Sequence, residues 1–313
     1  MGVRHSSKWY RHSVRRAGLR RGDRRLGLPR AFQPQLERLE SRQLLVANLT
    51  AHWLAEDLTA THEQGQTVTN WVDSIGDVTA VATGAPELVQ DVFGGQSIVR
   101  FDPSNGGDYF RVPATDSPMS GANDYTVVVV FATSSADLGS DSRFWFDQTG
   151  LIDTSQFGFA DDWGMSLNGE GQVAAGIGKR ATTQLSTQTG LNDGSPHVAT
   201  YTKGGDTISL YVDGQVDSTS GVSQAPRAAR EMWIGAITGG VFPYAGDVAE
   251  IRIYDDDLTP DEAEELNSEL LDQYQNSPPV VQDDTFVCMK TVRLSWTHPV
   301  YSKTTTPLLV QIR

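Results

Sequence analysis

The chain has 313 residues, of which 38 % are hydrophobic, and a formal net charge of −14 at pH 7. This length and apolar content allow one large β domain with tails, and no stretch reaches the ~18 apolar residues of a membrane-spanning helix. The one cysteine excludes an intramolecular disulfide, and no Cys/His set has zinc-ligand spacing.

The charge is divided unevenly along the chain. Residues 1–46 hold 12 Lys or Arg and 3 acidic residues, whereas the remainder holds 13 basic and 36 acidic residues. An acidic body repels nucleic acid and suits high salt, divalent cations or basic partners. The basic head is typical either of a segment that contacts nucleic-acid phosphates or of a segment that targets the protein for export. We favour targeting, because the head lacks interleaved aromatic residues and zinc spacing.

The basic head leads into QPQLERLESRQLLVAN, residues 33–48. Its two Leu-Glu pairs and its Leu-Leu pair resemble the LEPR-XLL segment of large bacterial surface proteins, although Ser41 stands where that family has Pro. The resemblance implies export to the cell surface. The alternative is a short amphipathic helix. We expect a basic, disordered export segment at 1–47, a domain at 48–276 and a tail at 277–313.

The body of the chain consists of short β-type runs separated by Gly, Asp, Asn and Ser. Residues 125–131, YTVVVVF, form a continuous apolar run that is typical of a strand buried on both faces. Residues 207–212 alternate between apolar and polar, and Asp213-Gly214 then predicts a two-residue hairpin turn. Together these runs predict an all-β fold, a sandwich or a jelly roll.

The last predicted strand is VAEIRIY, residues 248–254. A period of two buries Ala249, Ile251 and Ile253 and leaves Glu250 and Arg252 as an exposed ion pair.

A C-terminal amphipathic helix is expected directly after this strand. Residues 259–262, Thr-Pro-Asp-Glu, supply an N-cap, a proline at the first helical position and a capping-box glutamate. Apolar residues then recur at helical spacing from Ala263 to Tyr274, which is enough to pack one face on the sandwich.

These last elements resemble the closing strand and helix of LamG-like, or concanavalin A-like, jelly-roll domains. The other segments that agree in order are VTNWVDSIGD (68–77), SIVRFDPSNGGDYFRV (97–112), PHVATYTKGGDTISLYVDG (196–214) and MWIGAITGGVFPYAGD (232–247). The resemblance implies a sandwich of two antiparallel sheets with a closing helix, and a role in adhesion or carbohydrate binding.

The sequence lacks the patterns of the enzymes that share this fold. Laminarinase-like glycosidases carry E-x-D-x-x-E, and retaining hydrolysis needs two carboxyls about 5–5.5 Å apart. Here Asp247 and Glu250 are three residues apart, so a regular strand sends them to opposite faces. GMSLNG (164–169) lacks nucleophile-elbow spacing, and we expect His197 to be a hydrogen-bonded structural residue. We therefore expect no catalytic residues, with an unrecognised polysaccharide-active enzyme as the alternative.

Calcium is the cofactor that the family resemblance suggests. LamG-like domains often hold this ion at a sandwich rim, and calcium takes 6–8 oxygen ligands. The candidate ligands are Asp102, Asp108, Asp247 and Asp255. The alternative is a solvated acidic surface, and Ala249 stands where many relatives have Asp.

Trp145, Trp163 and Trp233 are the candidate ligand contacts, since aromatic rings present apolar faces to sugars. Each also lies in a β-type run where a core tryptophan is expected. The expected partners are glycans or surface proteins, and the expected location is extracellular or at the cell surface. The main alternative function is an architectural spacer within a large surface protein.

The tail begins as a Pro-broken linker, NSPPVVQDDTFV at 276–287, which resembles the start of cadherin-like or immunoglobulin-like repeats. From Cys288 the chain becomes basic and loses that pattern. Reading the gene one base later permits the acidic residues typical of such a repeat. We therefore expect a frameshift near Val287, which resequencing the locus would test.

Overall fold

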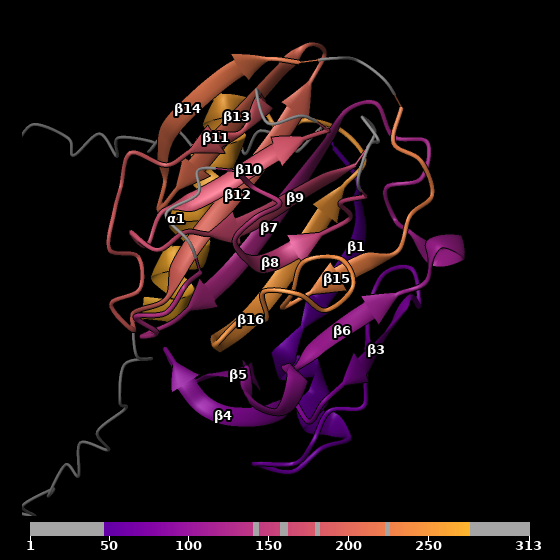
Figure 1. The fold of residues 1–313 in the computed structure, drawn as a ribbon, viewed down its shortest axis with the longest axis vertical. Helices are drawn as coiled ribbons and strands as arrows, with labels where there is room; N and C mark the ends of the chain where they lie inside the picture. The colour runs from indigo at the N-terminus through magenta and orange to yellow at the C-terminus, as the bar shows by residue number, and fades with distance from the viewer. Residues whose placement is uncertain (1–46, 140–143, 157–161, 179–181, 223–225, 276–313) are drawn as a thin grey trace, which may run out of the picture. The chain divides into compact units, whose positions relative to one another are not determined.

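The computed structural model describes residues 47–139, 144–156, 162–178, 182–222 and 226–275 (Figure 1). They all fall in one compact unit of the chain. The LEPR-XLL resemblance lies almost wholly outside them, as does the tail. The expected domain boundaries and the frameshift therefore stay predictions.

The described residues form two antiparallel sheets of eight strands each, which confirms the predicted all-β sandwich. In Figure 1 the strands β8, β9, β10 and β15 lie in front of β7, β12 and β16. Sheet A runs in the order β14 (Gln215–Gly221), β13 (Thr207–Val212), β12 (His197–Gly204), β7 (Tyr125–Ala132), β16 (Gly246–Tyr254), β5 (Gln96–Phe101) and β4 (Glu87–Phe93), with β1 (Leu49–Leu54) paired to β16.

Sheet B runs in the order β11 (Gln184–Leu185), β10 (Val173–Ile177), β9 (Trp163–Leu167), β8 (Thr149–Asp153), β15 (Met232–Ile234), β6 (Tyr109–Val112), β3 (Thr79–Thr83) and β2 (Asn70–Val72). Short 3-10 turns lie between strands at η1 (Ala55–Ala60), η2 (Ser104–Gly106) and η3 (Ala114–Asp116).

The strand β7 lies inside sheet A, between β12 and β16, and every one of its residues is buried, as the apolar run predicts. Val127 and Val129 pack in the core between the two sheets, whereas Val128 and Val130 belong to a second cluster on the other face of sheet A. A strand of β-branched residues suits this position, because it can bury both of its faces.

The predicted hairpin turn between β13 and β14 is confirmed. Asp213 and Gly214 both have positive φ, at 51° and 80°, and Val212 pairs with Gln215 across the turn. Asp and Gly adopt these angles at the lowest cost, which explains why a two-residue loop suffices here.

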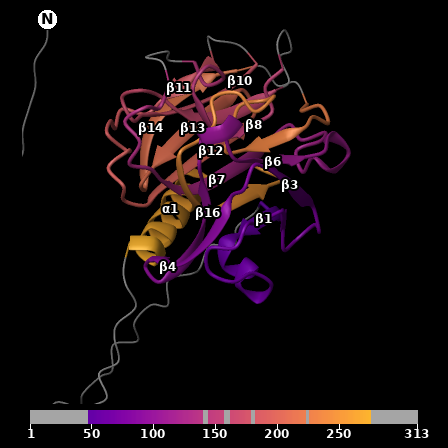
Figure 2. The ribbon, with the colours of Figure 1, turned by 60° about the horizontal axis from the view of Figure 1, so that its bottom comes forward.

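The helix α1 (Pro260–Gln275) covers the face of sheet A that points away from sheet B, as Figure 2 shows. Its start is the predicted capping box. The amide of Thr259 donates to Glu262 Oε2 at 2.9 Å, and the amide of Glu262 donates back to Thr259 Oγ1 at 3.4 Å. The helix buries Ala263, Leu266 and Tyr274 against the sheet.

The prediction that Glu250 and Arg252 form an exposed ion pair is wrong. Glu250 is 1 % exposed, and its carboxylate accepts hydrogen bonds from His52 Nε2 at 2.8 Å, from Tyr274 Oη at 2.7 Å and from Arg252 Nε. Tyr274 of α1 and His52 of β1 lie against Glu250 on this face of β16, so its carboxylate is buried instead of lying in solvent.

A β-bulge at Ala249 accounts for a second difference. Val248 pairs with Phe131 and Glu250 with Val130, so Ala249 is an extra residue in β16. Ala249 therefore packs on the α1 side, while Val248 and Ile251 pack in the core between the sheets. The bulge also brings Asp247 and Glu250 to the same face, contrary to the expectation from a regular strand.

Candidate ligand-binding groove

A groove lies on the outer face of sheet A beside α1, where β5 and β7 end and β16 begins. Its larger part is a cavity of about 500 Å³, and a cavity of about 340 Å³ continues on the other side of Arg100. We call these two cavities the edge groove. The first is lined mainly by Val92, Phe93, Arg100, Phe101, Ala132, Thr133, Ser134, Ser135, Gly246 and Asp247, and the second by Gly84, Ala85, Glu87, Arg100, Asp102, Ser104, Asn105 and Asp108.

The wall of the larger cavity depends on a close approach between the end of β7 and the start of β16. A Cβ atom on Gly246 would collide with the carbonyl oxygen of Ala132, so only glycine fits there. The buried hydroxyl of Tyr244 donates to the same oxygen at 2.6 Å. Thr133 Oγ1 accepts the amide of Ser135 at 3.0 Å and shapes the hydroxyl-bearing turn that follows β7.

The two cavities meet at a bidentate ion pair. Arg100 Nε lies 2.8 Å from Asp247 Oδ1, and Arg100 Nη2 lies 2.9 Å from Asp247 Oδ2. The hydrogen bond to Asp247 is the main reason that the pKa of Arg100 is raised. The Arg100 side chain is 50 % exposed, so it keeps a polar face toward a ligand while Asp247 fixes its orientation.

Asp108 and Asp102 shape the smaller cavity by accepting backbone amides. Asp108 is buried, and its two oxygens accept the amides of Ala85 at 2.6 Å and of Asp102 at 2.9 Å. Asp102 accepts the amide of Ser104 at 2.8 Å, and this bond lowers the pKa of Asp102. Both carboxylates therefore stabilise the loop between β5 and β6.

Three of the four predicted calcium ligands, Asp102, Asp108 and Asp247, line this groove, whereas Asp255 follows the opposite end of β16 and accepts the amide of Asn48 at 2.7 Å. The donors as arranged do not fit a calcium ion. Both oxygens of Asp247 engage a guanidinium and both oxygens of Asp108 engage amides. No cluster of three or more metal-binding side chains occurs among the described residues.

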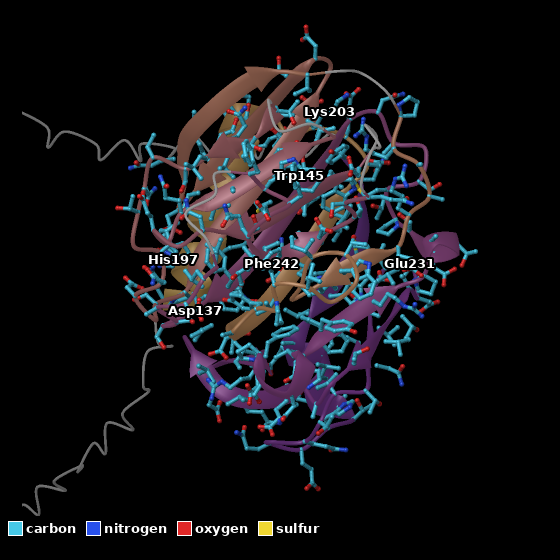
Figure 3. All side chains as sticks on the ribbon, in the orientation of Figure 1. Asp137, Trp145, His197, Lys203, Glu231 and Phe242 are labelled. Carbon is cyan, nitrogen blue, oxygen red and sulfur yellow. The ribbon has the colours of Figure 1, made fainter. Side chains whose placement is uncertain are left out.

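The three candidate tryptophans lie away from the groove and are buried. Trp163 points into the core between the sheets and packs on Tyr125. Trp145, labelled in Figure 3, lies over Gly164 and Gly176 on the outer face of sheet B, where a Cβ at either glycine would collide with its ring. Trp233 is 7 % exposed. Their role as ligand contacts stays a prediction.

His197 begins β12 and is held by two carboxylates. Its Nδ1 lies 2.8 Å from Asp213 Oδ2 and its Nε2 lies 3.2 Å from Asp193 Oδ1. Burial lowers the pKa of His197, but the two carboxylates raise it by more, so it lies above its ordinary value. The contacts tie the start of β12 to the β13–β14 turn, in agreement with a structural role.

Sequence reasoning missed Arg100, Phe93 and the hydroxyl turn at 133–135. Arg100 is an outward-facing residue in an alternating strand, which by itself carries no functional signal. Its partner Asp247 is 147 residues away, so only the pairing of β5 with β16 brings the two together.

Residues 104–264 match the concanavalin A-like lectin/glucanases superfamily, and this span is half of the chain. The chain belongs to this superfamily. The matched span runs from η2 to α1 and thus includes the ends of β7 and β16 that line the edge groove. A search of curated proteins gave no match.

Two solved structures illustrate how this superfamily fold recurs. Domain 4 of AbnA, an extracellular arabinanase from Geobacillus stearothermophilus solved with arabinotriose, is 16 % identical over 71 % of this chain and 98 % of its own, with a TM-score of 0.50. The binding domain of Paraclostridial Mosquitocidal Protein 1 is 12 % identical over 73 % of this chain and 55 % of its own, with a TM-score of 0.53. Similarity at this level shows the fold alone.

Within the described part of the chain, no helix has the length and hydropathy needed to cross a bilayer.

Proposed function

We propose that this chain is a non-catalytic carbohydrate-binding module that acts outside the cell, in glycan binding or adhesion, and that the edge groove is its ligand site. The composition of the groove carries this proposal. Val92 supplies apolar surface in front of the largely buried rings of Phe93 and Phe101, the turn at 133–135 supplies hydroxyl groups, and Arg100 supplies oriented donors. Sugars require this combination, because a sugar ring has apolar faces and a rim of hydroxyls.

The comparisons support a binding module in general terms. The superfamily includes lectins, and the two neighbours are the domain of a glycan-degrading enzyme solved with an oligosaccharide and the binding domain of a toxin. Extension to surface export and adhesion rests on the basic head and the LEPR-XLL resemblance.

The proposal that the module is non-catalytic rests on the contacts of two acidic residues, Asp247 and Glu250. Asp247 is paired with Arg100, and Glu250 is buried beneath α1, so these two carboxyls do not stand free on either side of a bound sugar. A glycosidase needs two accessible carboxyls flanking the scissile bond.

The proposal is tested by binding of the full chain to a panel of soluble oligosaccharides that includes arabinotriose, measured by calorimetry. Replacing Arg100 by Ala removes charged donors worth about 1.5–3 kcal/mol each, so we expect a loss of affinity of at least ten-fold. Asp255→Ala is the control, because Asp255 follows the opposite end of β16 and lines neither cavity of the groove.

Two further results decide between this function and its alternatives. If no oligosaccharide binds and none raises the melting temperature, the chain is an architectural spacer. Turnover of any panel member would instead establish an enzyme. Repeating the titration with calcium and then with a chelator tests the predicted calcium requirement, which the paired carboxylates of the groove argue against.

A further inference from the structure

Apart from the two cavities of the edge groove, a cavity of about 330 Å³ lies where β6 and β8 end and β15 begins. The edge groove includes Asp108 at the other end of β6 and shares no lining residue with this cavity, so the two are separate. In Figure 3 the label for Glu231, which lines this cavity, stands on the opposite side of the view from His197 and Asp137. We call it the Ser155 pocket, after a residue in its wall.

A buried carboxylate fixes the wall of the Ser155 pocket. Asp153 is 0 % exposed, and its Oδ2 accepts four hydrogen bonds, from the amide and hydroxyl of Ser155 at 2.9 and 2.7 Å and from the amide and hydroxyl of Thr238 at 2.8 and 2.7 Å. Ser155 and Thr238 come from different loops, and both line the pocket. Asp153 Oδ1 has no hydrogen-bond partner among the described residues.

The hydrogen bonds to Asp153 decide what the pocket offers to a ligand. Burial raises the pKa of Asp153 to about 6, so the carboxyl is ionised at neutral pH and accepts hydrogen bonds from the hydroxyls of Ser155 and Thr238. Thr154 is buried, and its hydroxyl donates to the carbonyl oxygen of Trp163 at 2.9 Å and accepts the amide of Trp163 at 3.0 Å, so it is fully engaged within the protein. The hydroxyl protons of Ser155 and Thr238 point into the protein, so these two oxygens present acceptor lone pairs to the pocket.

The charges around the pocket nearly balance. Arg230 and Glu231 stand in the same wall; Arg230 donates to Gln156 Oε1, and Glu231 lies 3.3 Å from Arg111. A wall of balanced charge that presents the two acceptor oxygens of Ser155 and Thr238 suits a neutral ligand that donates hydrogen bonds. It disfavours a carboxylate, which has only acceptors to offer and would face the charge of Asp153.

We propose that the Ser155 pocket is a second carbohydrate site, which takes one unit of a neutral sugar through hydrogen bonds from its hydroxyls to Ser155 and Thr238. This proposal deepens the proposed function and rests on it. A cavity of 330 Å³ lies in the size range of small-ligand pockets. Two separate sites on one module permit one chain to bind two glycan strands or two positions along one strand.

The test is calorimetric titration of the full chain at neutral pH with arabinotriose, cellotriose and xylotriose, and with a sialylated trisaccharide as the acidic probe. Ser155→Ala combined with Thr238→Val removes the acceptors. Ala229→Trp places a large side chain at the exposed mouth of the pocket without touching Asp153, and it covers the case in which the first variant unfolds. Ala60→Trp, at an exposed position on η1, is the matched control.

Wild-type protein is expected to bind two equivalents of at least one neutral probe. Ala229→Trp should remove one equivalent or weaken it at least ten-fold, Arg100→Ala should remove the other, and Ala60→Trp should leave both. One equivalent that is lost only in Arg100→Ala overturns the second site and leaves the edge groove intact. One equivalent that is lost only in Ala229→Trp overturns the groove instead. Equal binding of the sialylated probe overturns the neutral-ligand assignment, and no binding by any probe overturns both sites.

Discussion

The buried cluster around Glu250 gives the sharpest prediction about stability. Glu250→Gln keeps the size of the side chain and removes its charge, so Arg252, which is only 22 % exposed, loses its partner in a region of low polarity. Hydrogen bonds to charged groups are worth about 1.5–3 kcal/mol, and breaking a buried ion pair costs about 3–5 kcal/mol. Because Arg252 keeps some contact with water, we expect a loss near the low end, about 2–3 kcal/mol.

The assay is urea denaturation of the full chain at pH 7, followed by far-ultraviolet circular dichroism. The matched control is Glu231→Gln, which makes the same substitution in a pair whose two side chains are 51 % and 44 % exposed. Such exposed pairs contribute about 0–1 kcal/mol. Equal losses from the two substitutions would refute the burial of Glu250 beneath α1 and restore the exposed pair that periodicity alone predicts.

The same cluster sets a dependence on pH. Burial raises the pKa of Glu250, but the hydrogen bond from His52, the charge of Arg252 and the hydrogen bond from Tyr274 outweigh burial, so the pKa lies below its usual value. The ionised form is therefore stabilised in the folded state. This contribution is present above the unfolded pKa and is lost as the pH falls through the folded pKa. The difference between wild type and Glu250→Gln should shrink on acidification.

Three further substitutions test other parts of the fold. Burial raises the pKa of Asp153 from 3.8 to about 6, so the free energy of unfolding of wild type should fall relative to that of Asp153→Asn by about 2 kcal/mol as the pH rises from 4 to 6. Urea midpoints of the two proteins that change in parallel across that range would contradict this. Gly176→Ala drives a methyl group into the ring of Trp145 and should cost about 1–3 kcal/mol by urea denaturation, whereas Gly221→Ala, with no neighbour closer than 3.7 Å, should cost less than half as much. Thr259→Ala removes the helix cap and should lower the free energy of unfolding by about 1 kcal/mol, and an unchanged urea midpoint would argue against the capping box.

Local sequence patterns predicted the elements whose cause is local. The run at 125–131 identifies a strand buried on both faces, Asp213-Gly214 identifies the hairpin, and residues 259–262 identify the start of α1. Each depends on propensity or turn chemistry within a few residues.

The environment of β16 was beyond such patterns. Period two treats the strand as regular and half exposed, but Tyr274 of α1 and His52 of β1 enclose Glu250 on its outer face, and a bulge at Ala249 changes which side chains share a face. Neither the bulge nor the helix position leaves a signal within the strand itself.

The candidate sites were also beyond local reasoning. The edge groove depends on the pairing of Arg100 with Asp247, and the Ser155 pocket depends on Thr238 meeting Asp153 from another loop. The acidic residues singled out as calcium ligands stand out by charge alone, whereas the structure uses Asp108 and Asp247 to accept backbone amides and a guanidinium.

The most direct test of the central claim is a comparison of oligosaccharide binding among the wild-type chain, Arg100→Ala and Asp255→Ala. Circular dichroism first shows that all three proteins are folded. The predicted result is saturable binding by wild type, with one equivalent lost or weakened at least ten-fold in Arg100→Ala and none affected in Asp255→Ala. Binding of equal strength in all three proteins would contradict the edge groove as the ligand site, and the absence of binding in wild type would contradict the carbohydrate-binding function itself.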